Sequence, residues 1–227
     1  MGGREEEVKI LGFWASPFVH RVQWALNLKG IHYEYAEEDL WGGKSALLLS
    51  SNPVHKQVPV LIHNAKLLVD SLLILEYIDQ TWVHRDQILP TDPYERAMAR
   101  FWAKFVDEKL MGPAFRAMCS SGEKKVMGAN SVTESLDFLE RVLKGKKFFG
   151  VENVGYLDFA LGWLAYMLEV WEEVGSMKIM DANKFPCLAN WMKSFVDHPL
   201  IKDSLPPRDK MVVYFEERRK ILASLFN

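Results

Sequence analysis

Residues 10–18 read ILGFWASPF, a short apolar run that ends in a serine followed by a proline. Residues 8–14 are apolar and aromatic enough to form a buried strand, and the apolar side chains after Pro17 recur at helical spacing. Proline suits the first position of a helix, and serine suits the cap before it. The sequence therefore predicts a strand, a tight corner at Ser16 and a helix from Pro17 to about Lys29.

The corner at Ser16 is suited to holding a negative charge. The first backbone N–H groups of a helix have no partner within the helix, and this end of the helix dipole is positive. A serine hydroxyl at this end lies beside a site that favours a thiolate or an oxyanion. The alternative is that Ser16 serves only as the helix cap, which is the ordinary role of a serine before a proline.

Two patterns are visible along the chain, and they change near residue 83. Before that point, strand-like and helical runs alternate, first as strand, helix and strand, then as a hairpin followed by a helix. The strands are expected at residues 8–14, 31–37, 58–63 and 66–69, and the later helix at residues 71–82. The first strand, helix and strand form a right-handed parallel unit, so a small α/β domain is expected over residues 1–83.

The rest of the chain is expected to be helical. After a turn-rich linker over residues 84–92, glycines and prolines separate amphipathic or buried helical runs. These runs cover residues 93–115, 131–143, 157–174, 188–198 and 209–225. The sequence thus predicts an all-helical second domain over residues 93–227. Within it, Asp158 follows Gly155 by three residues, a spacing that favours a structural role at the start of a helix over a catalytic one.

Composition limits the classes of function. The chain has 227 residues, is 49% hydrophobic, and carries 28 Lys and Arg against 30 Asp and Glu. A net charge of −2 gives no basic surface for nucleic acid or an anionic membrane, so a small molecule or a protein partner is expected. Two separated cysteines, Cys119 and Cys187, fit a reducing, cytoplasmic setting, and the scattered histidines indicate no metal site. Neither a signal peptide nor a membrane span is predicted.

Two further features favour a ligand near Ser16. Pro59 starts a strand, where it marks an edge or a bend. A cis Val58–Pro59 bond would turn the backbone of Val58 outward to pair with an extended peptide. Asp70 and Ser71 open a helix, where the carboxylate could hold a ligand ammonium and the serine a ligand carboxylate.

Lys44 and Lys56 flank the same region as flexible cations that could bind a second carboxylate. Together with the other features they predict a peptide-like zwitterionic ligand whose thiol would lie beside Ser16. Each feature also has a plain structural interpretation: the polar pair caps a helix, the proline ends an edge strand, and the lysines are solvated.

Several segments, taken in order, resemble glutathione transferases of the plant tau class over nearly the whole chain. They are WASPF (residues 14–18) with Arg21-Val22, KGIHYEY (29–35), EEDL (37–40), KS (44–45), LLL (47–49), NPVHK (52–56), VPVL (58–61) and SLLILEYID (71–79). The resemblance implies a thioredoxin-like first domain with the order βαβαββα, an all-helical second domain, and a cytoplasmic homodimer.

The resemblance also implies a serine-type mechanism without a metal. Glutathione, the co-substrate, would bind the first domain, Ser16 would donate a hydrogen bond to its sulfur, and the thiolate would attack a hydrophobic electrophile in a detoxifying conjugation. The implied glutathione contacts are Ser16, Lys44, Lys56, Val58, Pro59, Asp70 and Ser71. The implied acceptor contacts are Phe13, Phe18, Met111, Phe115, Met167 and Tyr214. Methionine and aromatic stripes at helical spacing are more often core, and this alternative stays open for the helical candidates.

Three features depart from the tau-class pattern. Asp70 stands in place of the usual glutamate, Gln57 in place of a common second lysine, and Gly42-Gly43 lengthens the loop before Lys44. These differences favour a weaker hold on glutathione and keep a second hypothesis open, a ligand-binding carrier of the same fold with little turnover. Glutathione-dependent peroxide reduction is an expected side activity, whereas thiol-disulfide reduction would need a cysteine at position 16.

Overall fold

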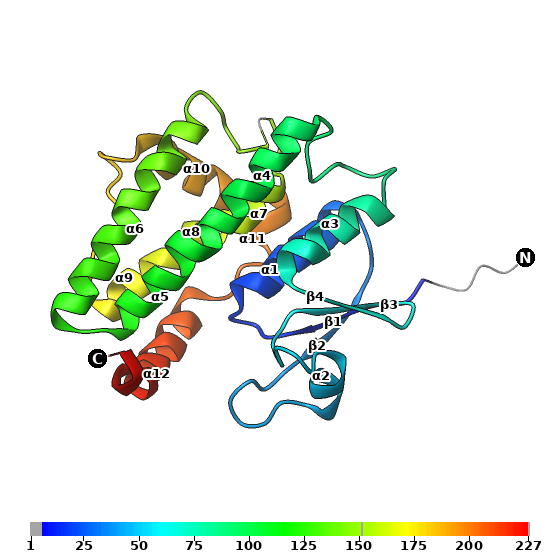
Figure 1. Cartoon of the computed structure of the whole chain (residues 1–227), viewed down its shortest axis with the longest axis horizontal. Helices are drawn as coiled ribbons and strands as arrows, with labels where there is room; N and C mark the ends of the chain where they lie inside the picture. Colours follow the sequence, from blue (N-terminus) through cyan, green and yellow to red (C-terminus); the bar gives the residue numbers. More distant parts are fainter. Residues whose placement is uncertain (1–5, 151, 227) are drawn as a thin grey trace, which may run out of the picture. The chain divides into compact units, whose positions relative to one another are not determined.

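The computed structural model describes residues 6–150 and 152–226 and divides into two compact units (Figure 1). The first ends at Ile88 and the second begins at Leu89, within the segment whose composition indicates a linker. The first unit contains the sheet, and the second is built from helices.

The first unit holds a four-stranded sheet in the order β2-β1-β3-β4. The strands are β1 (Val8–Gly12), β2 (Glu34–Glu37), β3 (Val60–His63) and β4 (Lys66–Val69). β1 pairs in parallel with β2 and antiparallel with β3, which in turn pairs antiparallel with β4. This is the βαβ unit followed by a hairpin that the sequence predicts.

Three helices complete the first unit: α1 (Pro17–Leu28), α2 (Ala46–Ser51) and α3 (Ser71–Thr81). β1 ends at Gly12, two residues earlier than expected, because the carbonyl of Phe13 turns to accept the Ser16 N–H at 2.9 Å. β2 starts three residues later than expected. Gly30 (φ +62°) ends α1, and the Ile31 N–H remains bonded to the Leu26 carbonyl at 2.9 Å, which holds this segment against the helix end.

The second unit contains ten helical segments within the described residues. They are α4 (Pro93–Phe105), η1 (Val106–Met111), α5 (Gly112–Cys119), α6 (Gly122–Leu143), α7 (Tyr156–Leu161), α8 (Trp163–Tyr166), α9 (Leu168–Gly175), α10 (Pro186–Val196), α11 (Pro199–Lys202) and α12 (Arg208–Phe226). α4, η1 and α5 form one run that widens into a π-helical turn just before Pro113, which has no N–H to offer the helix. α6 begins nine residues earlier than predicted. In the described part of the chain, no helix is both long and apolar enough to cross a bilayer.

Asp158 has the structural role that its spacing indicates. Its carboxylate is fully buried and accepts hydrogen bonds from the backbone N–H groups of Phe149, Gly150 and Gly155, each at 2.9 Å. It also accepts a bond from the indole Nε1 of Trp191 at 2.8 Å. Burial raises the pKa of this carboxyl, and the four donors oppose that shift. One carboxylate therefore joins the loop before α7 to α10.

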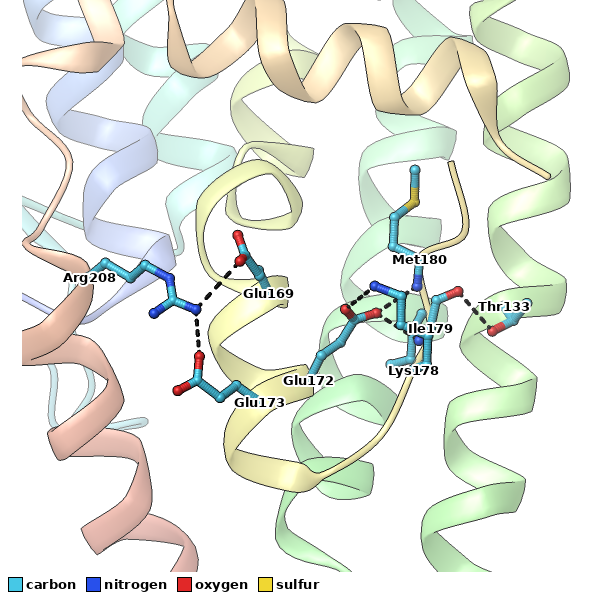
Figure 2. Close-up of polar contacts among 8 residues, drawn as sticks. All are labelled: Thr133, Glu169, Glu172, Glu173, Lys178, Ile179, Met180 and Arg208. Atoms are coloured by element: carbon cyan, nitrogen blue, oxygen red, sulfur yellow. Dashed lines mark hydrogen bonds and ion pairs between the residues drawn. The ribbon is translucent and has the colours of Figure 1, made fainter. Parts of the chain in front are cut away.

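A second buried carboxylate, Glu172 on α9, organises the segment that follows this helix (Figure 2). It accepts the backbone N–H groups of Ile179 and Met180, both at 2.7 Å, and the Nζ of Lys178 at 2.8 Å. Thr133 of α6 donates to the Ile179 carbonyl at 3.3 Å. These bonds fix the connection after α9 to the body of the helical unit.

Candidate active site

Ser16 caps α1, as the sequence predicts. Its backbone is extended (φ −89°, ψ 114°), and its Oγ lies 3.4 Å from the Val19 N–H, from which it accepts a hydrogen bond. Ser16 is only 8% exposed, and the first turn of α1 contains no acidic residue that would neutralise the positive helix end. Because a hydroxyl can accept and donate at once, capping leaves the Ser16 proton available to a ligand.

His20 and Glu37 hold the corner that carries Ser16. The buried His20 donates from Nε2 to the Trp14 carbonyl at 2.9 Å, and Glu37 accepts the Trp14 N–H at 3.1 Å. Glu37 also accepts the hydroxyl of Tyr35 at 2.7 Å. Burial lowers the pKa of His20 to about 4, with the bond to Trp14 acting in the opposite direction. The imidazole is therefore neutral at pH 7.

The buried His20 should make the folded chain sensitive to acid. Its pKa is lowered from 6.5 to about 4, so between these pH values the unfolded chain binds a proton that the folded chain does not. The free energy of unfolding should therefore fall as the pH drops from 6.5 to 4, by up to about 3 kcal/mol from this group. In urea titrations across this range, His20→Gln, which keeps a donor for Trp14, should remove that part of the slope. An unchanged slope in the variant would contradict the assignment.

Asp70 and Ser71 lie at the start of α3, and both have structural partners. Asp70 accepts the N–H groups of Leu72 and Leu73 on Oδ1, at 2.9 and 3.2 Å, and adopts φ +73°. Within the described residues, its Oδ2 has no hydrogen-bond partner. Ser71 is buried and its Oγ accepts from Nη1 of Arg21 at 3.1 Å, a contact from α1 that sequence reasoning missed. The capping interpretation is confirmed for Asp70, whereas Ser71 joins the start of α3 to α1.

The side chain of Lys44 is held against the backbone of Lys56, whereas Lys56 itself is solvent-exposed. Lys44 donates from Nζ to the backbone carbonyl of Lys56 at 2.7 Å, and Lys56 is exposed with φ +54°. The buried Asn52 shapes the same turn by donating to the Gln57 carbonyl at 3.0 Å. The next peptide bond, Val58–Pro59, is cis, as expected, and both its residues are buried.

Glu38 and Asp39 organise the longer loop before Lys44, and sequence reasoning missed both. The buried Glu38 accepts the N–H of Ser45 at 3.1 Å and its hydroxyl at 2.7 Å, while Ser45 caps α2. Asp39 Oδ1 accepts the N–H of Gly42 at 2.7 Å, and a Cβ on Gly42 would lie 2.2 Å from Asp39 Oδ2. A side chain at position 42 would displace the Asp39 carboxylate, so glycine leaves room for the hydrogen bonds that hold this loop.

The acceptor candidates differ in exposure. In the first unit, Phe13 is nearly buried, whereas Phe18 is 37% exposed and lies beneath the guanidinium of Arg21. In the second unit, Met111 is nearly buried and Met167 has no exposed surface. The structure therefore favours the core interpretation for Met167.

Phe115 and Tyr214 are half-buried at the edge of an aromatic cluster in the helical unit. The ring of Phe115 meets Trp171 edge-on at 5.5 Å between centroids, and Trp171 meets Phe215 at 5.7 Å. Tyr214 packs edge-on against Phe215 at 5.0 Å. These two side chains keep surface that a flat apolar molecule could contact. Residues 6–150 and 152–226 contain no group of three or more side chains placed to hold a metal ion.

Comparisons with known proteins agree on one family. Residues 6–80 match the family described as "Glutathione S-transferase, N-terminal domain". A probable glutathione S-transferase of Glycine max is 45% identical over 225 residues, covering 99% of both chains. Glutathione S-transferase U8 of Arabidopsis thaliana is 48% identical over 209 residues, covering 92% of this chain and 93% of the relative.

Two solved structures share the fold over almost the whole length. The tau-class glutathione S-transferase of mango, Mangifera indica, is 45% identical, with a TM-score of 0.86 over 96% of this chain and 99% of that chain. A rice glutathione transferase solved in complex with glutathione is 34% identical, with a TM-score of 0.88 and the same coverage. The chain therefore belongs to the glutathione S-transferase family. Within that family it is a glutathione transferase of the plant tau class.

Proposed function

We propose that this chain activates the thiol of glutathione with Ser16 and transfers the sulfur to a hydrophobic electrophile. The observation that carries the proposal is the position of Ser16, a residue only 8% exposed whose hydroxyl lies at the positive end of α1, where the first turn holds no acidic side chain. The rice relative was solved with glutathione, which supports the same co-substrate here.

In the proposed reaction the protein is not the nucleophile. The glutathione thiol loses its proton to solvent, and the thiolate is held by the Ser16 hydroxyl and the N–H groups at the start of α1. The sulfur lone pair then attacks the electrophilic carbon, and the leaving group departs with its bonding electrons. Lowering the thiol pKa from about 9 to about 6.5 requires roughly 3 kcal/mol of preferential thiolate stabilisation. One charge-assisted hydrogen bond and a helix end can supply this amount.

The remaining contacts are assigned to the ends of glutathione in the first unit. Asp70 Oδ2 would hold the ammonium, Ser71 and the start of α3 a carboxylate, and Lys44 with Lys56 the second carboxylate. The backbone of Val58, before Pro59, would pair with the peptide. Asp70 is short and already bound to two N–H groups, which supports a modest rather than a tight hold on the ammonium.

The helical unit would supply apolar side chains for the acceptor, with Phe115 and Tyr214 as the accessible candidates beside Met111. Phe13 and Phe18 are the candidates from the first unit. We also propose a cytoplasmic homodimer. Apolar side chains left exposed on α4 and α6 support the dimer, among them Tyr94, Phe101, Met127 and Phe138. The unpaired thiols Cys119 and Cys187 support the reducing compartment.

A paired assay tests the proposal against the carrier alternative. The purified chain is passed over immobilised glutathione, and its rate of conjugating glutathione to chlorodinitrobenzene is measured. Retention together with turnover supports the enzyme. Binding of an apolar dye without retention or turnover would identify a carrier and contradict the proposed reaction.

Substitution of the buried Glu38 tests whether Lys44 contributes to glutathione binding. Glu38→Gln weakens both bonds to Ser45 and loosens the loop that precedes α2, so Lys44 loses its fixed position. We expect the KM for glutathione to rise roughly 3- to 10-fold while kcat changes less than twofold, because the chemistry at Ser16 is untouched. The control is Glu34→Gln, an exposed carboxylate on β2 that pairs with Lys9. If kcat falls and KM stays constant, the loop does not act through glutathione binding.

A further inference from the structure

Two arginines attach the last helix to the body of the helical unit. Arg208, the first residue of α12, bridges Glu169 and Glu173 on α9 (Figure 2). Arg219, three turns later, donates from Nε to the Met118 carbonyl of α5 at 3.0 Å. α12 therefore packs against α5 and α9 in a fixed register.

A cavity of about 430 Å³ lies where α5, α9 and α12 meet. Its volume falls in the range of cavities that bind small organic molecules. Its walls include Cys119, Ser121, Val174, Arg219, Lys220 and Ala223. Val174, Ala223 and Cys119 form an apolar wall, and Arg219 and Lys220 form a polar one. Burial raises the pKa of Cys119 to about 11, so its thiol stays protonated and acts as an apolar surface.

The polar wall is suited to an anion. The Nε bond of Arg219 orients its guanidinium, while its terminal nitrogens and the Lys220 ammonium make no hydrogen bond or ion pair with any residue that the structure describes. Glu216 also lines the cavity, but it forms no ion pair with either cation. Two cations against one carboxylate leave a net positive charge. An oriented guanidinium with free terminal donors matches the geometry of a carboxylate, which it can bind with two parallel hydrogen bonds.

We propose that this cavity binds a small organic carboxylate with an apolar body. The carboxylate would lie against Arg219 and Lys220, and the apolar body would contact Val174 and Ala223. A polar zwitterion such as glutathione suits it less well, because its ammonium would face the two cations. The site uses no residue assigned to the proposed reaction, so this proposal is independent of that function.

Calorimetric titration with sodium 2-naphthoate tests the proposal on the full-length chain. S-hexylglutathione is present throughout to occupy the proposed catalytic site. We expect saturable binding at one site, and roughly tenfold weaker binding of the neutral analogue 2-naphthamide, because the amide cannot pair with a guanidinium as an anion does.

Two variants locate the site independently. Arg219→Gln removes the cation, and Ala223→Phe fills the cavity while leaving the bond between Arg219 and Met118 in place. Each should weaken 2-naphthoate binding at least roughly tenfold. The matched control is Arg141→Gln on α6, away from the cavity, which should bind like the wild type. Thermal unfolding of each variant shows that the fold is kept.

Three results would overturn the proposal. The first is no saturable binding by the wild type, and the second is binding that survives both Arg219→Gln and Ala223→Phe. The third is equal affinity for 2-naphthoate and 2-naphthamide, which would identify an apolar surface without anion recognition.

Discussion

Ser16→Ala should lower the kcat for glutathione conjugation by roughly 10²- to 10³-fold, with little change in affinity for glutathione. The substitution removes the one side-chain donor that the proposed mechanism aims at the sulfur, and losing a single such donor to a developing anion has an effect of this size in other enzymes. Steady-state kinetics with chlorodinitrobenzene measure kcat, and calorimetry measures glutathione binding. A folded Ala variant with wild-type turnover would contradict the role of Ser16.

Other substitutions at position 16 separate catalysis from helix capping. Ser16→Asp keeps an acceptor for the Val19 N–H, and aspartate caps helices well, but it has no proton to donate at neutral pH. It should therefore fold like the wild type and lack activity. Ser16→Thr keeps the hydroxyl and should recover much of the rate. Ser135→Ala, a half-buried serine on α6, should change neither property.

Asp158→Ala should lower the free energy of unfolding by about 4 kcal/mol. The substitution leaves three backbone N–H groups and the Trp191 indole buried without their acceptor, and an unsatisfied buried donor costs about 1–3 kcal/mol. Some of these groups regain solvent as the loop relaxes, which keeps the total below a simple sum. Urea denaturation followed by circular dichroism measures the loss.

The control for Asp158 is another aspartate of the same unit. The Asp137 side chain is 39% exposed and pairs with Lys184 at 3.2 Å, so Asp137→Ala should cost less than about 1 kcal/mol. Asp158→Asn keeps one side-chain oxygen as an acceptor and should lie between the two. If Asp158→Ala and Asp137→Ala destabilise equally, the four bonds to Asp158 do not contribute as described.

Much of the fold could be predicted because its signals are local. Ser16-Pro17 and Asp70 mark the starts of α1 and α3 within one residue, and β4 has the predicted bounds. The early start of α6 depends on packing that no local pattern shows. Its first turn, residues 122–125, is polar, yet Gly128 lies so close to α5 that a Cβ there would be 3.0 Å from the Cβ of Ala117. Tertiary contact, not propensity, extends this helix.

The candidate site, like the fold, could be predicted only where its signals are local in sequence. Ser16 and Asp70 could be interpreted from their neighbours, because a cap is defined within four residues of sequence. The bonds from Arg21 to Ser71 and from Trp14 to Glu37 join residues 50 and 23 positions apart, so no spacing rule could reveal them. At Met167 the local pattern is visible but ambiguous. Its helical stripe fits a core and a ligand wall equally well, and only burial distinguishes the two.

The pKa of the glutathione thiol bound to the protein tests the central claim most directly. It can be measured from the ultraviolet absorbance of the thiolate as the pH is raised, in the wild type and in Ser16→Ala. Hydrogen bonding by Ser16 predicts a bound-thiol pKa of about 6.5 in the wild type and a return toward about 9 in the variant. The same pKa in both proteins would contradict thiol activation by Ser16.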